Sequence, residues 1–265
     1  VEIPLGEWFP DRAALGEPVS VATNVIPWAD GYKPFLSFSV VSSNALTARF
    51  QGGLFGRDSA SNVYQFSGDA TKLYRLNAAA WVDVSRLAGG AYTTASDDWW
   101  EMIQWGETII AVNGTTDVPQ VFTLGSSANF VALGGTPPKA RHIGIIRDFV
   151  VVGNINDGTA YPSRVQWCGI NNSASWAVSA ATQADYQDLQ GDGGWIQKIV
   201  GGEYGLVFQE RAIWRMTYVG SPEIFQFDLT ERKRGAFAPQ SVVSWGANVF
   251  YLADDGFYVI SGGAE

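Results

Sequence analysis

The sequence predicts an all-β protein built from repeated β-propeller blades behind an extended, proline-rich N-terminal arm. Composition, a recurring strand–turn–strand unit and the spacing of that unit each point to this fold. Of the 265 residues, 14% are aromatic and 30 are glycine, while only 16% are charged. Aromatic residues suit pleated, half-buried strands, and glycine supplies the turns between them. The chain also lacks the long Leu, Lys and Glu rows of a helical bundle.

The predicted arm covers residues 1–44 and differs in composition from the rest of the chain. Five of the 11 prolines lie in it, namely Pro4, Pro10, Pro18, Pro27 and Pro34. Because proline lacks a backbone donor and fixes φ, we expect an extended, irregular segment with one short strand at most. Its aromatic residues are Trp8, Phe9, Trp28, Tyr32 and Phe35. We expect these side chains to be buried against the body of the protein or against a neighbouring subunit.

Residues 45–265 form the predicted propeller. A strand, a turn and a second strand rich in aromatic and β-branched residues recur in 102–112, 142–153, 199–208 and 242–252, with an earlier copy in 48–76. The predicted turns are Gly106–Glu107, Arg147–Asp148, Gly202–Glu203 and Gly246–Ala247. A Trp-Gly pair occupies the same place in two of the units, at 105–106 and 245–246. The pattern gives about five blade-like units, of which we expect the last to be truncated.

The spacing of these units favours blades over other repeats. Turns at 106, 147, 203 and 246 are 41, 56 and 43 residues apart, and propeller blades recur at roughly 40–50 residues. An insertion over 171–194, with a short helix at 177–189, would account for the long interval. A β-sandwich is the alternative fold, since it also uses short strands and regular turns. It would not explain why Trp-Gly returns at matching places in distant units.

Charge and cysteine content exclude several classes of protein. The net charge of −9 argues against tight nucleic-acid binding, which depends on a basic face. The single cysteine, Cys168, excludes an intramolecular disulfide and a cysteine-based zinc site, and we expect it to be a small buried residue. No stretch reaches the roughly 18 apolar residues of a membrane span. The chain begins at Val1 without a signal-peptide layout, which suggests a fragment or a processed form.

The search for a catalytic site gives a negative expectation. The single histidine, His142, begins an apolar strand, and no Gly-x-Ser-x-Gly nucleophile motif accompanies it. Residues 156–159 only partly resemble the Asp-box of sialidase-like propellers, and the glycines at 191–194 lack the Lys of a phosphate loop. The basic run Arg232–Arg234 is expected at a solvated loop tip or a contact between subunits. We therefore predict no catalytic, cofactor-binding or metal-binding residues, and no enzyme.

Paired carboxylates are the one pattern that supports an alternative, because glycoside hydrolysis uses two of them. The candidate residues are Asp97, Asp98, Asp185, Asp188, Asp192, Asp254 and Asp255. Asp and Gly are also the ordinary residues of tight turns, which explains most of these positions without catalysis. A carbohydrate-binding or glycan-cleaving propeller would place exposed Trp side chains and two carboxylates together in a concave site.

Several stretches resemble a known family of virion proteins. They are 22–35, 181–189, 191–196, 202–218, 224–228 and 249–258, with the highest density between 176 and 260. Together they are similar to the tail nozzle, or packaged-DNA stabilisation, proteins of short-tailed bacteriophages and prophages. The matching strings describe blades and not a catalytic constellation.

The resemblance implies a structural role in the virion tail, after assembly in the bacterial cytoplasm. Members of the family form a ring of six subunits below the portal and adaptor, around the DNA exit channel. Self-association, portal, adaptor and other tail proteins, and transient contact with packaged double-stranded DNA are the implied partners. The acidic charge agrees with a channel along which DNA slides without binding. The alternatives are the carbohydrate-binding propeller, acting as a receptor-binding tail component, and a host-encoded scaffold for protein partners.

Overall fold

The computed structural model describes residues 23–28 and 31–262, and the chain divides into two compact units, 1–41 and 42–265. In the first unit, β1 (Val25–Trp28) pairs antiparallel with β2 (Gly31–Pro34). Residues 35–41 follow as an extended segment outside any strand. The rest of the predicted arm, residues 1–22, lies outside the described residues.

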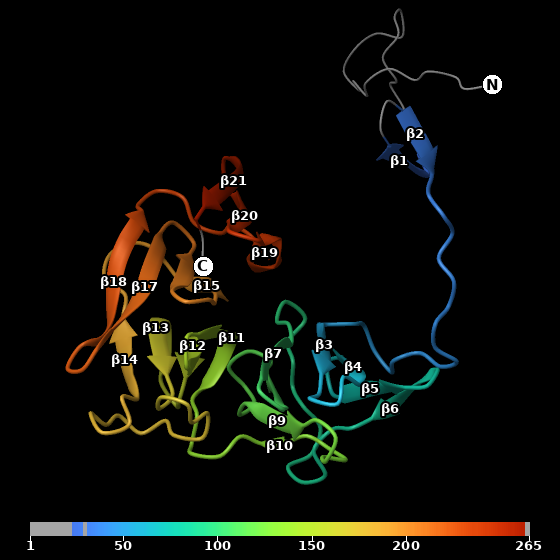
Figure 1. Cartoon of the computed structure of the whole chain (residues 1–265), viewed down its shortest axis with the longest axis horizontal. Helices are drawn as coiled ribbons and strands as arrows, with labels where there is room; N and C mark the ends of the chain where they lie inside the picture. The colour runs from blue at the N-terminus through green and yellow to red at the C-terminus, as the bar shows by residue number, and fades with distance from the viewer. Residues whose placement is uncertain (1–22, 29–30, 263–265) are drawn as a thin grey trace, which may run out of the picture. The chain divides into compact units, whose positions relative to one another are not determined.

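The second unit is a five-bladed β-propeller of antiparallel sheets, as the sequence predicted (Figure 1). Blade 1 contains β3 (Gly53–Arg57), β4 (Val63–Gly68), β5 (Leu73–Asn77) and β6 (Ala80–Asp83). Blade 2 contains β7 (Glu101–Trp105), β8 (Thr108–Val112), β9 (Gln120–Thr123) and β10 (Val131–Ala132). Blade 3 contains β11 (Lys139–Ile146), β12 (Phe149–Asn156), β13 (Ala160–Trp167) and β14 (Asp185–Asp188).

Blade 4 contains β15 (Ile196–Val200), β16 (Gly205–Gln209), β17 (Ile213–Gly220) and β18 (Ile224–Glu231). Blade 5 has three strands among the described residues, β19 (Val243–Trp245), β20 (Asn248–Ala253) and β21 (Gly256–Ser261). A single 3₁₀ turn at Pro239–Ser241 precedes it. In the part of the chain that the structure describes, no helix is long and apolar enough to cross a membrane.

All four predicted turns are confirmed, and each joins the first two strands of a blade. Trp105 pairs with Thr108 and Trp245 with Asn248, so both Trp-Gly pairs begin a two-residue turn. Gly106 and Gly246 have φ of 55° and 56°, a conformation that glycine adopts without strain. The repeat in the sequence is therefore the repeat of the first hairpin in each blade.

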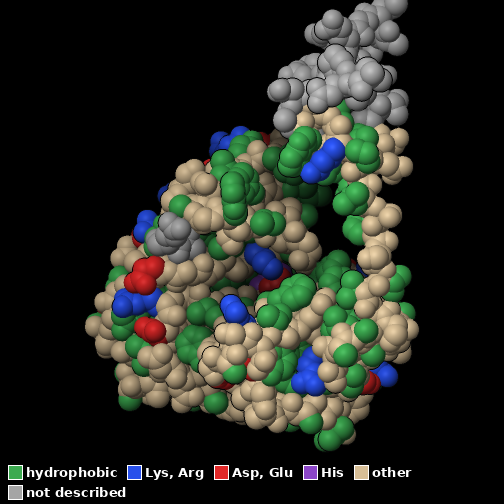
Figure 2. All heavy atoms as spheres, turned by 45° about the vertical axis from the view of Figure 1, so that its right-hand side comes forward, with side chains coloured by type: hydrophobic (Ala, Val, Ile, Leu, Met, Phe, Trp, Pro, Cys, Tyr) green, Lys and Arg blue, Asp and Glu red, His purple; other side chains and the backbone are tan. Residues whose placement is uncertain are grey.

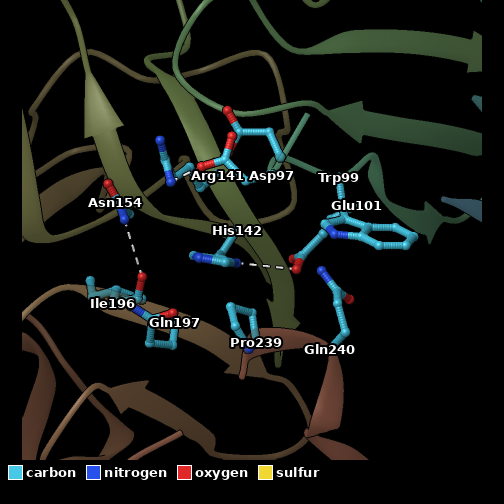
Figure 3. A pocket seen from close by; sticks show the side chains of 11 residues that line it. Asp97, Trp99, Glu101, Arg141, His142, Asn154, Ile196, Gln197, Pro239 and Gln240 are labelled. Atoms are coloured by element: carbon cyan, nitrogen blue, oxygen red, sulfur yellow. Dashed lines mark hydrogen bonds and ion pairs between the residues drawn. The ribbon is translucent and has the colours of Figure 1, made fainter. Parts of the chain in front are cut away.

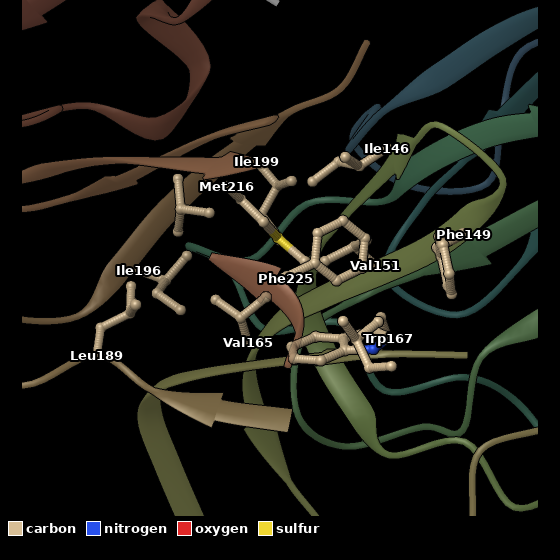
Figure 4. Packing of buried hydrophobic residues seen from close by; sticks show 12 residues of the cluster. Ile146, Phe149, Val151, Val165, Trp167, Leu189, Ile196, Ile199, Met216 and Phe225 are labelled. Atoms are coloured by element: carbon tan, nitrogen blue, oxygen red, sulfur yellow. The ribbon is translucent and has the colours of Figure 1, made fainter. Parts of the chain in front are cut away.

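The blades are held together by apolar clusters between neighbouring sheets. Successive residues of a strand point to opposite faces, so the wholly apolar run of β12 serves two neighbours. Val150 and Val152 pack in the cluster shared with blade 2, and Val151 packs in the cluster shared with blade 4. Figure 4 shows the cluster between blades 3 and 4, where Phe149 and Trp167 lie against Phe225.

The helix predicted at 177–189 is wrong. Residues 177–184 form turns, and Asp185–Asp188 is β14, the outermost strand of blade 3. The reason is pairing with β13, in which Trp167 lies opposite Asp185 and Arg164 opposite Asp188. Loosely spaced apolar residues gave no helical stripe to compete with that ladder. The predicted insertion thus contains the loop that carries the chain to the outer edge of its own blade.

Candidate functional site

The first strands of blades 2, 3 and 4 place three ionisable side chains together. Glu101 begins β7, His142 lies near the start of β11, and Lys198 lies in β15. Glu101 Oε1 is 3.1 Å from His142 Nδ1 and accepts a hydrogen bond from Lys198 Nζ at 2.8 Å. The backbone N–H of Ile143 donates to the other oxygen at 3.3 Å. One buried carboxylate therefore joins three blades (Figure 3).

Charge compensation explains why a buried carboxylate is stable at this place. The Glu101 side chain is only 7% exposed, and burial by itself would raise the pKa of its carboxyl. The charges of His142 and Lys198, and their hydrogen bonds, act in the opposite direction and lower the pKa of Glu101 to about 2. The carboxylate is thus ionised and fully engaged, so its function here is to hold the blades together.

A second carboxylate lies three residues earlier in the chain and is in a different state. Asp98 is buried, and its Oδ1 is 3.3 Å from a guanidinium nitrogen of Arg141. Burial raises the pKa of Asp98, and Asp97 adds to this, although Arg141 opposes it. Asp98 has a single cationic partner where Glu101 has two. A carboxyl whose pKa is raised in a hollow is the kind of group that functional sites use.

The two carboxylates face a small hollow of about 90 Å³ among the inner strands. Its other lining residues include Asp97, Trp99, Asn154, Gln197 and Gln240. In Figure 2, basic and acidic side chains meet in the hollow between the blades. The half-exposed Trp195 lies beside it, with the Arg141 guanidinium 5.9 Å from its ring. The hollow combines hydrogen-bonding groups with two indole rings, which suits a small polar ligand that also has an apolar face.

Among the predicted carboxylate candidates, the structure brings only Asp97 and Asp98 to the lining of this hollow. Asp188 is held by Arg164 at 2.6 and 2.7 Å on the outer strands of blade 3. Asp254 and Asp255 form the turn between β20 and β21. The remaining two, Asp185 and Asp192, lie in β14 and in the loop before β15.

The basic run Arg232–Arg234 follows β18 and is satisfied within the chain. The backbone N–H groups of Arg232 and Lys233 donate to Glu231 Oε1, which lowers the pKa of Glu231. Arg234 donates to Asp255 at 2.8 Å. These contacts favour a local turn-stabilising role for the run.

Cys168 is buried, as expected, in the apolar cluster between blades 2 and 3. Burial raises the pKa of its thiol to about 11, so the thiol stays protonated and is a poor nucleophile. Over residues 23–28 and 31–262, no three His, Cys, Asp or Glu side chains gather closely enough to hold a metal ion.

Sequence reasoning singled out His142 and Asp98 but missed Glu101, Arg141 and Lys198. The repeat itself held the missing signal. Glu101 lies five residues before Gly106, His142 five before Arg147, and Lys198 five before Glu203. Equivalent positions in successive blades approach one another around a propeller axis. Aligning the units on their turns would therefore have predicted this cluster.

Comparisons with known proteins give a distant structural similarity. No family model matches the chain, and no curated protein matches it. The solved structure of U3-55K is similar over 75% of this chain and 72% of that chain, with 13% sequence identity and a TM-score of 0.39.

Proposed function

We propose that this chain is a structural subunit of a bacteriophage tail that assembles into a ring around the DNA exit channel. The resemblance of residues 202–218 and 249–258 to tail nozzle proteins supports a virion role. The observation that carries the assembly is the open face of blade 5. There Val243, Phe250 and Val259 lie opposite one another across three strands, and all are exposed.

This apolar face extends further along the same strands. Trp245 is 76% exposed and Phe257 is 86% exposed. With Phe250, they present on the order of 400 Å² of aromatic surface. A contiguous patch of this size on a monomer marks an interaction site. The opposite face of the sheet, which includes Val249 and Tyr251, is already buried against blade 4.

The acidic charge supports a channel role. A net charge of −9 repels the phosphates of DNA, so packaged DNA would pass the ring without binding to it. We expect the purified protein to show no binding to duplex DNA at physiological salt.

Electron microscopy of purified particles tests the proposal directly. The expected result is a ring of propellers, six by the family resemblance, below the portal, with the chain identified in the particles by mass spectrometry. Absence of the chain from purified virions would refute the proposal. A measurable hydrolase activity of a monomeric protein would also contradict it.

The axial hollow supports a second candidate function, glycan binding by a receptor-binding tail component. Trp99 and Trp195 offer stacking surfaces on either side of Asp98 and Arg141, and sugars bind to such combinations of rings and charged hydrogen-bonding groups. Binding on a glycan array that Asp98→Asn or Trp195→Ala removes, while Asp192→Asn leaves it unchanged, would support this function. Asp192 lies outside the hollow lining, so it is the matched control.

A further inference from the structure

The fifth blade differs from the other four at its outer edge. In blades 1 to 4, a fourth strand covers the third, as β18 covers β17. In blade 5, among the described residues, β21 is the last strand and has a partner on one side only. An unpaired edge strand exposes a row of backbone donors and acceptors that can pair with another strand.

The apolar cluster between blades 4 and 5 is also incomplete at this edge. Tyr258 and Ile260 of β21 pack against the cluster but are only partly buried. In blade 4, the equivalent side chains of β17 lie beside Phe225 and Phe227 of the fourth strand. A fourth strand in blade 5 would bury Tyr258 and Ile260 in the same way.

The chain contains a segment with the pattern of that strand. Residues 36–41 read Leu-Ser-Phe-Ser-Val-Val, with apolar and polar side chains in strict alternation up to Val40. Leu36, Phe38 and Val40 are 83%, 90% and 90% exposed, and in the described structure the segment belongs to no strand. Strand β18 has the same alternation, with Phe225, Phe227 and Leu229 on its buried side. A strand-patterned segment with exposed apolar residues is suited to a sheet edge.

We propose that residues 36–41 of one copy of this chain pair with β21 of a second copy and form the fourth strand of its blade 5. Backbone hydrogen bonds to the β21 edge would supply affinity, and the alternating side chains would supply register. Leu36, Phe38 and Val40 would then cover Tyr258 and Ile260, and Ser37 and Ser39 would lie on the open face. Because the donor segment and the acceptor edge differ, the contact is head-to-tail and generates a ring when its rotation closes. This inference rests on the self-association in the proposed function.

The mass of the full-length chain in solution is the first test, measured by light scattering across a concentration series. We expect an oligomer for the unaltered chain. The double variant Phe38→Asp with Val40→Asp should weaken association about a hundredfold, because two buried apolar side chains become charged. Leu87→Asp is the matched control, since Leu87 is 89% exposed and lies outside both surfaces. A monomeric unaltered chain, or an oligomer that the double variant leaves unchanged, would overturn the proposal.

Disulfide trapping tests the pairing itself, because Cys168 is buried and stays out of the reaction. Chains carrying Ser37→Cys or Ser39→Cys are mixed with chains carrying Phe257→Cys or Val259→Cys under mild oxidation. Strand partners lie close enough for a disulfide, so we expect at least one mixed pair to cross-link. Ser126→Cys in place of the β21 cysteine should not cross-link. The absence of every mixed cross-link would overturn the proposal, as would a bond that forms only when both cysteines lie in one chain.

These outcomes are separable from those of the proposed function. If the chain is absent from virions, the tail role fails and strand exchange stands. If the oligomer ignores the substitutions at Phe38 and Val40, strand exchange fails and the tail role stands.

Discussion

Glu101 and Asp98 lie three residues apart at the inner end of blade 2, and their protonation equilibria differ in direction. Both are buried, which by itself raises the pKa of each carboxyl. Two cations and a backbone donor reverse this for Glu101, whereas Arg141 alone does not reverse it for Asp98. The number of compensating partners, and not the degree of burial, decides which carboxylate is structural and which remains available to the hollow.

Removing the first carboxylate should have the largest effect. Glu101→Gln leaves Lys198 and His142 without their anionic partner, and breaking a buried pair in this way costs about 3–5 kcal/mol of unfolding free energy. Denaturant unfolding at neutral pH measures the loss. Glu203→Gln is the control, because the Arg147–Glu203 pair at 3.5 Å is exposed and should contribute less than about 1 kcal/mol. Equal losses in the two variants would refute the structural role of Glu101.

The acid dependence of stability should follow from the same carboxylate. Its pKa is lowered from 4.5 to about 2 on folding, so its contribution is present above the unfolded value. That contribution is lost as the pH falls from about 4.5 toward 2, and a shift of this size corresponds to about 3 kcal/mol. Unfolding midpoints of the unaltered chain and Glu101→Gln should therefore converge over that interval. Parallel curves would show that Glu101 is not the group that titrates.

The second carboxylate should give a smaller effect of opposite sign. Because the pKa of Asp98 is raised on folding, its contribution to stability is present at low pH and is lost as the pH rises through the folded pKa. Asp98→Asn should therefore be neutral or stabilise the protein by up to about 1 kcal/mol at neutral pH, and this gain should shrink below about pH 4. A clear loss of stability at neutral pH would show that the Arg141 pair outweighs the cost of burial.

Most of the fold followed from local patterns in the sequence. Gly106 and Gly246 marked first hairpins because a two-residue turn requires positive φ, and glycine with its preceding Trp repeats at both places. The helix expected at 177–189 failed because pairing with β13 decides the structure of Asp185–Asp188, and that partner lies some 20 residues earlier in the chain. Local composition carries no record of such a partner.

The sequence by itself determined the strand–turn periodicity, the number of blades and the burial of Cys168, since these depend on alternation, turn chemistry and apolar runs. Tertiary structure alone decided the meeting of Glu101, His142 and Lys198, which are 41 and 97 residues apart from Glu101 along the chain. The physical reason is that their partnership is electrostatic and acts through space. Its strength depends on how closely three blades approach one axis, and neighbouring residues in the chain do not encode that distance.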